Sequence, residues 1–375
     1  MKTKARKAVR IMLLSIALIG ACALLLLGLL WLWSPGRPRA IVDGQGRRPS
    51  GSLSEKVYVD INGVRQGMFI ESRDTANPVL LVVHGGPGCP DYMLTQKNPT
   101  GLEERFTVCW WEQRGAGMSY SPSIPPESMT VEQMVSDTIA VTNYLRGRFG
   151  QDKIYLLGHS WGTVIGMRTA QKAPELYRAY IAMSQISRQP ESERLAYGYM
   201  LKWYGEKGDR AMLRRLKAAP LGSKKYEGLR DEAMHRAGIG TMHNMKSIVD
   251  GIVLPELTCP QYSLAEKLAF LRGLAFSSAS GLRKEEWAAD LPREVPELKI
   301  PVYFFSGRHD YTVAYPLAKA YFEAIKSPVK GFYTFEGSAH SPLFEEPGRA
   351  GRILEEDVLA GTNRLSDKNT PSLYR

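Results

Sequence analysis

Short apolar runs alternate with segments of helical periodicity along most of this chain. A run that is apolar at nearly every position is typical of a strand buried on both faces, as in a parallel sheet. Such runs lie at Pro78–Val83, Arg105–Trp111, Ile154–Leu157, Tyr177–Met183, Pro301–Ser306 and Gly331–Phe335. Helix-compatible segments follow Thr130 and cover Trp161–Ala173, Ala314–Ile325 and Gly348–Leu359. This alternation predicts an α/β fold on a mostly parallel, doubly wound sheet.

Two segments that depart from this alternation of strands and helices define the domain organisation. Val57–Ile70 alternates around Asn62-Gly63, which predicts an antiparallel hairpin before the parallel strands. Between residues 187 and 293 helical periodicity dominates, with interspersed charges. An insertion after the fourth parallel strand lies over the carboxyl ends of the strands, where open α/β sheets bind ligands. We therefore expect a core of residues 55–186 and 294–362, a helical cap of residues 187–293, and a mobile tail of residues 363–375.

The longest apolar run, Ile11–Trp33, contains no charged residue and exceeds the roughly 20 residues that a bilayer span needs. Residues 1–10 carry five Lys or Arg and no acid, so the N-terminus is expected to stay cytoplasmic. These features predict a single-pass protein of the cell membrane: a basic segment at 1–10, an uncleaved anchor at 11–33, a linker at 34–54 and an extracytoplasmic domain that comprises the rest of the chain. A cleaved signal peptide is the alternative, and its apolar region is usually shorter. Cys22 has a lipobox-like context, but the apolar run continues beyond it.

Composition adds little beyond this picture. The formal charge of +11 is explained by the basic N-terminus and a solvated surface, and no nucleic-acid-binding motif is found. We therefore expect no nucleic-acid partner. The four cysteines match neither a disulfide framework nor a metal site, and we expect no metal and no cofactor.

The chemistry is carried by Gly158-His159-Ser160-Trp161-Gly162, which ends a β-forming run and precedes a helix-compatible segment. A G-x-S-x-G motif in this strand–turn–helix context is typical of a nucleophile exposed above the sheet. The two glycines are expected because strand and helix approach too closely there for a Cβ atom. Ser160 is therefore the candidate nucleophile.

A serine hydroxyl needs a base within reach and a carboxylate that orients the base. Asp310 and His340 follow the last two predicted strands, so the chain order is Ser, Asp, His. We expect Ser160, Asp310 and His340 to form a catalytic triad. His309 is the rival base, but it shares a loop with Asp310 and is poorly placed to reach both partners.

The oxyanion hole requires two backbone N–H donors. One is expected from Trp161, the residue after the nucleophile. The other is expected from Gly86, with Gly85 in reserve, in the glycine-rich loop after the first buried strand. His84 is expected to brace this loop.

Three motifs together resemble the α/β-hydrolase superfamily and, within it, the proline iminopeptidase-like serine hydrolases. They are His84-Gly-Gly-Pro-Gly88, Trp111-Glu-Gln-Arg-Gly-Ala-Gly-Met-Ser119 and the serine motif with its Asp310 and His340 loops. The resemblance covers roughly Val57 to Leu359 and implies an α/β-hydrolase fold with an inserted cap. Two positions depart from the family: Glu112 stands where an aspartate is typical, and His159 where a glycine is frequent. We expect Arg114 in the second motif to be a buried structural residue.

The resemblance also implies cap carboxylates that hold a substrate's free amino group. The cap offers Glu191, Glu193, Glu206, Asp209, Glu232 and Glu256, and no motif selects among them. The leading hypothesis is a membrane-anchored serine hydrolase that forms an acyl-enzyme and acts on a small peptide or ester, as an aminopeptidase of the proline iminopeptidase type. A carboxylesterase or lysophospholipase-like enzyme is the first alternative. A non-catalytic ligand-binding protein on a hydrolase scaffold is the second.

Overall fold

The computed structural model describes residues 2–367, whose strands form one eight-stranded sheet. The strand order is β1-β2-β4-β3-β5-β6-β7-β8. β2 pairs antiparallel with both β1 and β4, and all other neighbours are parallel. The strands are β1 (Leu53–Ile61), β2 (Val64–Ser72), β3 (Val79–Val83), β4 (Thr107–Trp111), β5 (Ile154–His159), β6 (Tyr177–Met183), β7 (Val302–Gly307) and β8 (Lys330–Phe335). The predicted mostly parallel α/β sheet is therefore confirmed.

The sequence explains both parts of this sheet. Every residue of β3, β4 and β5 is buried, as their continuous apolar runs predict. The antiparallel edge turns at Asn62 and Gly63, because Ile61 pairs with Val64. Asn62 and Gly63 have φ of 50° and 75°, a conformation that Asn-Gly adopts readily in a two-residue hairpin turn.

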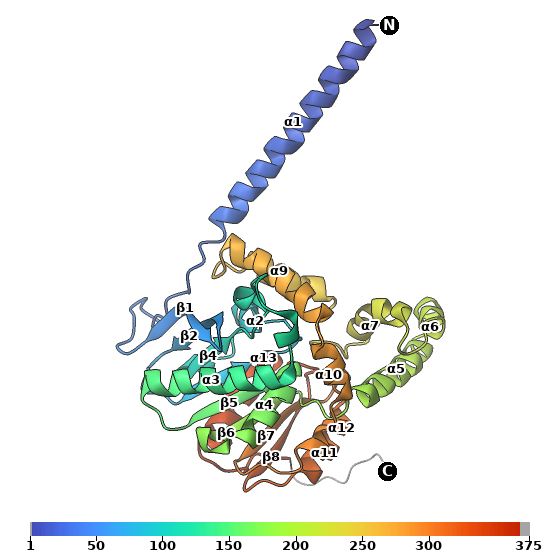
Figure 1. Ribbon diagram of the computed structural model, residues 1–375. Coiled ribbons are helices and arrows are strands. Elements are labelled where there is room, and N and C mark those ends of the chain that lie inside the picture. Colours follow the sequence, from blue (N-terminus) through green and yellow to red (C-terminus); the bar gives the residue numbers. More distant parts are fainter. Residues whose placement is uncertain (1, 368–375) are drawn as a thin grey trace.

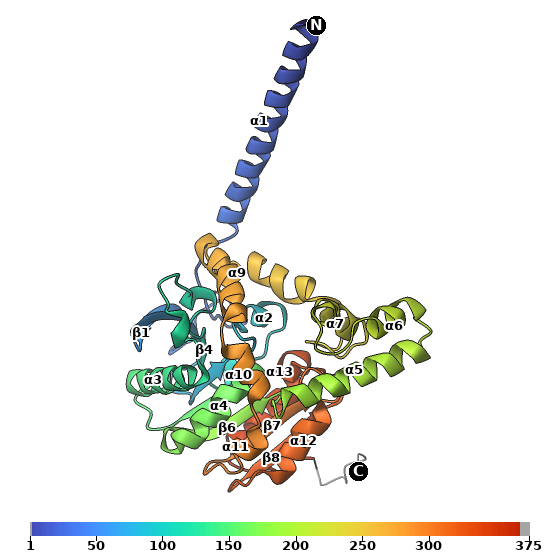
Figure 2. The ribbon, with the colours of Figure 1, turned by 45° about the vertical axis from the view of Figure 1, so that its right-hand side comes forward.

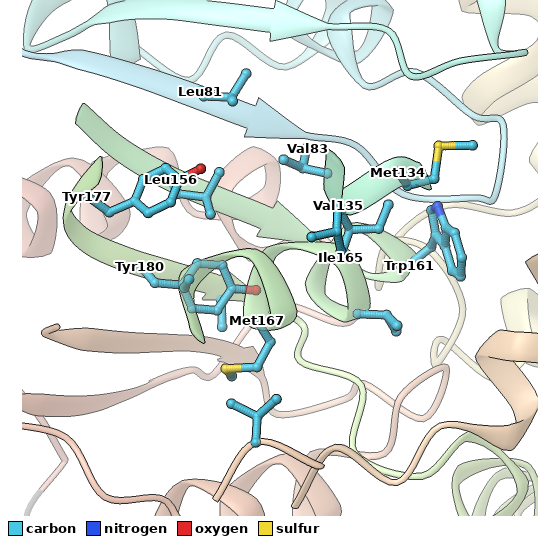
Figure 3. Packing of buried hydrophobic residues seen from close by; sticks show 14 of the residues in the cluster. Leu81, Val83, Met134, Val135, Leu156, Trp161, Ile165, Met167, Tyr177 and Tyr180 are labelled. Carbon is cyan, nitrogen blue, oxygen red and sulfur yellow. The ribbon is translucent and has the colours of Figure 1, made fainter. Parts of the chain in front are cut away.

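Helices cover both faces of the sheet. One face packs against α3 (Val131–Phe149), α4 (Trp161–Lys172) and α12 (Tyr315–Ala324). Figure 3 shows this layer, in which Leu81, Val83 and Leu156 of the strands lie near Val135 and Ile165 of the helices. The other face packs against α2 (Tyr92–Lys97), α13 (Pro342–Glu345), α14 (Pro347–Ile353) and the turn η6 (Leu354–Val358). The layered arrangement leaves the carboxyl ends of the parallel strands at one edge.

A helical insertion follows β6. Its helices are α5 (Gln189–Glu206), α6 (Arg210–Lys217), α7 (Lys224–Arg236), the π-helical turn η5 (Val249–Val253), α8 (Leu254–Thr258), α9 (Leu264–Ala279) and α10 (Leu282–Ala288), with α11 (Leu291–Glu294) leading back to the sheet. Helices α5, α6 and α7 project from the body and bury a small apolar core of their own (Figure 1). Four short 3₁₀ turns complete the chain: η1 (Leu102–Glu104), η2 (Gly117–Ser119), η3 (Pro126–Ser128) and η4 (Pro174–Leu176).

The N-terminal helix α1 (Lys2–Leu32) stands away from the body (Figures 1 and 2). Within the described residues, Arg10–Leu32 is the helical stretch long and apolar enough to cross a membrane, with a mean hydropathy of 2.8 and no burial. A signal sequence has the same properties. The chain after α1 is not a free spacer at its start, because the Gly36 N–H donates to the carbonyl of Pro260 at 3.1 Å.

The expected mobile tail differs from the structure over residues 363–367. This segment lies alongside β8. The Asp367 N–H donates to the Phe332 carbonyl at 2.8 Å, and the Phe332 N–H donates to Ser366 Oγ at 2.9 Å. The physical reason is that β8 is the edge strand of the sheet, so its backbone groups are open to a further partner. The remaining residues of the expected tail, 368–375, lie outside the described part of the chain.

Candidate active site

Ser160 lies in a sharp turn between β5 and α4. Its backbone has φ of 53° and ψ of −122°, a strained conformation for a residue with a side chain. The flanking glycines permit this turn, because a Cβ on Gly162 would lie 1.9 Å from the Val83 carbonyl oxygen and one on Gly158 would lie 2.6 Å from the Gly162 oxygen. Ser160 is partly exposed at the end of a fully buried strand.

Asp310 and His340 lie on the loops after β7 and β8, and the fold brings them into contact. Asp310 Oδ2 lies 2.9 Å from His340 Nδ1, and both side chains are buried. The other oxygen of Asp310 accepts from the N–H groups of Thr312 (2.9 Å) and Val313 (3.1 Å). Burial opposes ionisation of Asp310, but His340 and these hydrogen bonds outweigh it and lower the pKa of the carboxyl. An ionised Asp310 therefore faces Nδ1 and leaves Nε2 of His340 free to act elsewhere.

His159, the residue before Ser160, holds the loop that carries His340 in place. Its Nε2 donates to the His340 carbonyl at 3.1 Å, and its Nδ1 lies 2.9 Å from the Asp91 carboxylate. Ser184 Oγ donates to the same carbonyl at 2.8 Å. Burial lowers the pKa of His159, but Asp91 and the His340 carbonyl overcome this and raise it. The sequence marked His159 only as a departure from the family, and the structure gives it a positioning contact.

The glycine loop after β3 lies directly against the serine. A Cβ on Gly85 would lie 3.3 Å from Ser160 Cβ. His84 Nε2 accepts from the Gln113 N–H at 3.0 Å, so Nδ1 carries the proton and donates to the Gly85 carbonyl at 2.8 Å. Burial lowers the pKa of His84 to about 4, which keeps the ring neutral. His84 thus braces the loop that carries Gly85 and Gly86.

Trp161 begins α4, so its N–H has no carbonyl partner within the helix. Its indole Nε1 donates to Gln113 Oε1 at 3.0 Å, and Gln113 Nε2 donates to the His84 carbonyl at 2.7 Å. Gln113 therefore connects the serine turn between β5 and α4 to the glycine loop after β3. These are the two segments that are expected to supply the oxyanion-hole donors.

His309, the rival base, has a different environment. Its ring stacks on His243 with centroids 4.1 Å apart. Burial and His243 lower its pKa. The Asp310 carboxylate contacts His340, so the geometry favours His340 as the base.

Two residues of the second motif have structural roles. Arg114 forms a buried ion pair with Asp137 of α3, with Nε to Oδ2 at 2.8 Å. Glu112 accepts from the Tyr262 hydroxyl and from the Met118 N–H, each at 2.5 Å. Because Tyr262 belongs to the cap segment, Glu112 links cap and core, and burial raises its pKa to about 8.

The six cap carboxylates that the sequence analysis named divide into two groups. Four form ion pairs near the surface with Arg or Lys side chains: Glu191, Glu206, Asp209 and Glu232. Glu193 is buried and paired with Arg230 at 2.6 Å. Glu256 is buried, neither of its oxygens has a hydrogen-bond partner, and burial raises its pKa well above the usual value.

A seventh carboxylate, Glu286 of α10, was missed by the sequence reasoning because no motif surrounds it. It is buried, its Oε2 has no hydrogen-bond partner, and burial raises its pKa to about 7. It interacts electrostatically with Arg283, Arg230 and Glu193. Gln189 connects this group to the loop that carries Asp310, because its Nε2 lies 3.2 Å from Glu193 Oε1 and 2.9 Å from the Thr312 carbonyl.

Known proteins share this fold and much of this sequence. Residues 78–347 match the family described as the alpha/beta hydrolase fold. The probable aminopeptidase YbaC of Bacillus subtilis (strain 168) is 34% identical over 308 residues, which is 81% of this chain and 96% of that protein. A proline iminopeptidase of Clostridium botulinum is 29% identical over 286 residues, 74% of this chain and 88% of that protein. The solved structure of a proline iminopeptidase-related protein from Thermus thermophilus aligns with a TM-score of 0.52 at 20% identity, covering 82% of this chain and 98% of that one.

Proposed function

This chain belongs to the α/β-hydrolase family and is a hydrolase, and from that premise we propose that it is a membrane-anchored aminopeptidase of the proline iminopeptidase type. Its relatives include proteins named as aminopeptidases and proline iminopeptidases.

In the proposed reaction, Ser160 Oγ attacks the carbonyl carbon of the substrate's first peptide bond as His340 Nε2 takes the hydroxyl proton. The developing oxyanion accepts from the N–H groups of Trp161 and Gly86, with Gly85 as the reserve donor. His340 passes the proton to the leaving amine, the C–N bond breaks, and an acyl-enzyme remains. A water molecule, deprotonated by His340, then hydrolyses the ester and releases the N-terminal amino acid. Asp310 orients His340 and stabilises its cation throughout.

The observation that carries the peptidase over the esterase is the buried pair Glu193 and Glu286. An ammonium group needs a carboxylate partner when it leaves water. Glu286 has an unpartnered buried oxygen, and Gln189 links its neighbour Glu193 to the Asp310 loop. We assign Glu286, supported by Glu193, to the substrate's α-amino group. Glu193 is already neutralised by Arg230, so the charge that faces the ammonium group is assigned to Glu286, whose raised pKa of about 7 falls when the ammonium binds beside it.

The test compares free and N-acetylated prolyl, alanyl and leucyl arylamides on the full chain. We expect turnover of the free amines alone. Glu286→Gln should raise KM for them by about 10- to 200-fold, since an ion pair with a buried carboxylate contributes roughly 1.5–3 kcal/mol. Glu191→Gln, at a half-buried cap carboxylate that pairs with Arg188, serves as the matched control and should leave KM unchanged. Ser160→Ala should abolish both turnover and fluorophosphonate labelling.

Other outcomes select the alternatives. Equal turnover of blocked and free arylamides, with faster turnover of acyl esters, would make the chain a carboxylesterase or a lysophospholipase-like enzyme. Absence of fluorophosphonate labelling in the unaltered chain would favour a non-catalytic ligand-binding protein. Labelling of the Ser160→Ala chain at another serine would refute the assigned nucleophile.

We further propose that α1 remains attached as an anchor, with residues 1–10 in the cytoplasm and the catalytic domain on the other side. The support is the tight junction after α1, where Lys267 Nζ of the cap donates to Ser34 Oγ at 2.8 Å. Both groups of this contact are buried, and Ser34 lies two residues after the end of the helix. A junction built into the cap gives the helix a structural role in the mature protein.

A further inference from the structure

We infer that the outer surface of η5, α8 and α9 lies in the bilayer interface beside the anchor, with its apolar side chains in the headgroup–acyl boundary. We call this the interfacial face and define it by Val249, Leu254, Leu268 and Leu271. These side chains are exposed by 56%, 45%, 48% and 40%. The inference rests on the proposed membrane anchor and goes beyond the proposed activity.

The first observation is the composition of α9. Its inner side packs on the body through Lys267, Phe270, Gly273 and Ser277, which are buried. The exposed positions within the helix are Ala265, Leu268, Leu271, Arg272, Ala275, Ser278 and Ala279, of which Arg272 is the charged one. An apolar outer side is the reverse of the usual arrangement for a helix facing water.

The second observation is where this face lies. The Pro35 backbone forms a bridge with Ser263, the N-cap of α9, and Gly36 is hydrogen-bonded to Pro260. The N-terminus of α9 is thereby fixed at the end of α1. α9 starts at the base of α1: in Figure 1 it runs across below that base, and in Figure 2 it descends from the base toward α10. If α1 spans a bilayer, a helix in this position lies at the membrane surface.

The third observation is the charge around the face. Arg37 and Arg39 follow the junction directly and are exposed, as are Arg272 of α9 and Lys246 just before η5. Asp250 of η5 is exposed as the acidic side chain among them. A cationic rim around an apolar face is typical of helices that bind a surface containing anionic lipids. Trp31 and Trp33 at the end of α1 are also exposed, which suits the same interface.

The bilayer is favoured over a protein partner because the face is continuous with the anchor. A cavity of about 390 Å³ opens beside Leu254, between α2 and α8, and is lined in part by Met93 and Pro255 with Lys97 at its edge. This adds apolar lining to the same side of the molecule.

The experiment places an environment-sensitive NBD fluorophore on single introduced cysteines in the full chain, reconstituted in nanodiscs of phosphatidylcholine and phosphatidylglycerol. Cys22→Ala provides the background, and the same chain without an added cysteine corrects for labelling of native thiols. Leu271→Cys tests the face, and Leu29→Cys reports on the anchor. Leu195→Cys is the matched control, since Leu195 is exposed by the same 40% as Leu271 and belongs to α5, a helix that lies far from α1 (Figure 1).

We expect the label at position 271 to emit at shorter wavelength, to be quenched by acyl-chain spin-labelled lipids, and to be protected from aqueous iodide. The label at position 195 should show the opposite behaviour. Adding Leu268→Glu should abolish lipid quenching at position 271, while arylamide turnover stays unchanged and shows that the fold is intact.

Three results would overturn the inference. If spin-labelled lipid quenches the label at position 29 and iodide quenches the label at position 271, α1 spans the bilayer but the interfacial face does not contact it. If position 271 is protected from both quenchers, a second protein copy covers the face. If position 29 is not quenched by lipid, the anchor fails and the inference falls with it, while the proposed peptidase activity is untouched.

Discussion

At the scale of single residues, the position of His340 depends on His159, which hydrogen-bonds to its carbonyl oxygen. Asp91 and the His340 carbonyl raise the pKa of His159 against the effect of burial. The folded protein therefore binds this proton more tightly than the unfolded chain does. This contribution to stability is fully present below the unfolded pKa, about 6.5, and is lost as pH rises through the folded pKa.

His159→Gln should remove this pH dependence and leave the buried Asp91 carboxylate without its cation. We expect a loss of roughly 3 to 5 kcal/mol in the free energy of unfolding at pH 6 and a smaller loss at pH 9. Urea unfolding at the two pH values measures the difference. His235→Gln removes a buried histidine that contacts neither Asp91 nor His340 and controls for the loss of a histidine ring as such. An equal loss at both pH values for His159→Gln would contradict the charged state.

At the scale of elements, the turn from β5 to α4 was predictable because its signal is local. Strand formers, two glycines and a helix start are adjacent in sequence, and steric limits alone fix their roles. Thr130, which directly precedes α3, likewise caps the helix by accepting from the Gln133 N–H. Contacts that join distant elements left no such signal in the sequence. The role assigned to Glu286 depends on its interaction with Glu193, and that of Ser34 on a hydrogen bond from Lys267, 233 residues away. Short-range sterics can be derived from one sequence, whereas these meetings depend on the complete tertiary packing.

The same turn supports a prediction about Gly162. An added Cβ would meet the carbonyl oxygens of Val83 at 1.9 Å and His84 at 2.7 Å, and backbone cannot move aside as a side chain can. Gly162→Ala should destabilise the fold by about 1–3 kcal/mol or more and reduce turnover strongly, because the serine turn shifts. Gly147→Ala is the control. Gly147 lies at an exposed position of α3, where an added Cβ would meet nothing within 4 Å, so the substitution should stabilise the fold by roughly 0.5–1 kcal/mol. Thermal unfolding of both variants decides, and a neutral Gly162→Ala would refute the close approach.

At the scale of the whole molecule, the proposed topology makes the chain before β1 the accessible cleavage region. Arg39 and Arg47 are exposed there, and the bonds after them do not precede proline. Trypsin added outside intact cells should release an active fragment that begins at Ala40 or Arg48, while residues 1–10 stay protected. N-terminal sequencing of the fragment checks this. A protected catalytic domain, or a lipid-bearing chain that begins at Cys22, would contradict an uncleaved anchor.

The junction at Ser34 sets how this enzyme meets its substrates. A hydrolase on a long flexible stalk sweeps a volume above the membrane and can search it independently of its anchor. Here a single residue, Trp33, separates the end of α1 from the serine held by Lys267. With α1 in a bilayer, the mouth of the site has a fixed height and tilt, and the protein searches by lateral diffusion. The proposed peptide substrates are then within its reach only at the membrane surface. Peptides in bulk solution must first diffuse to that surface.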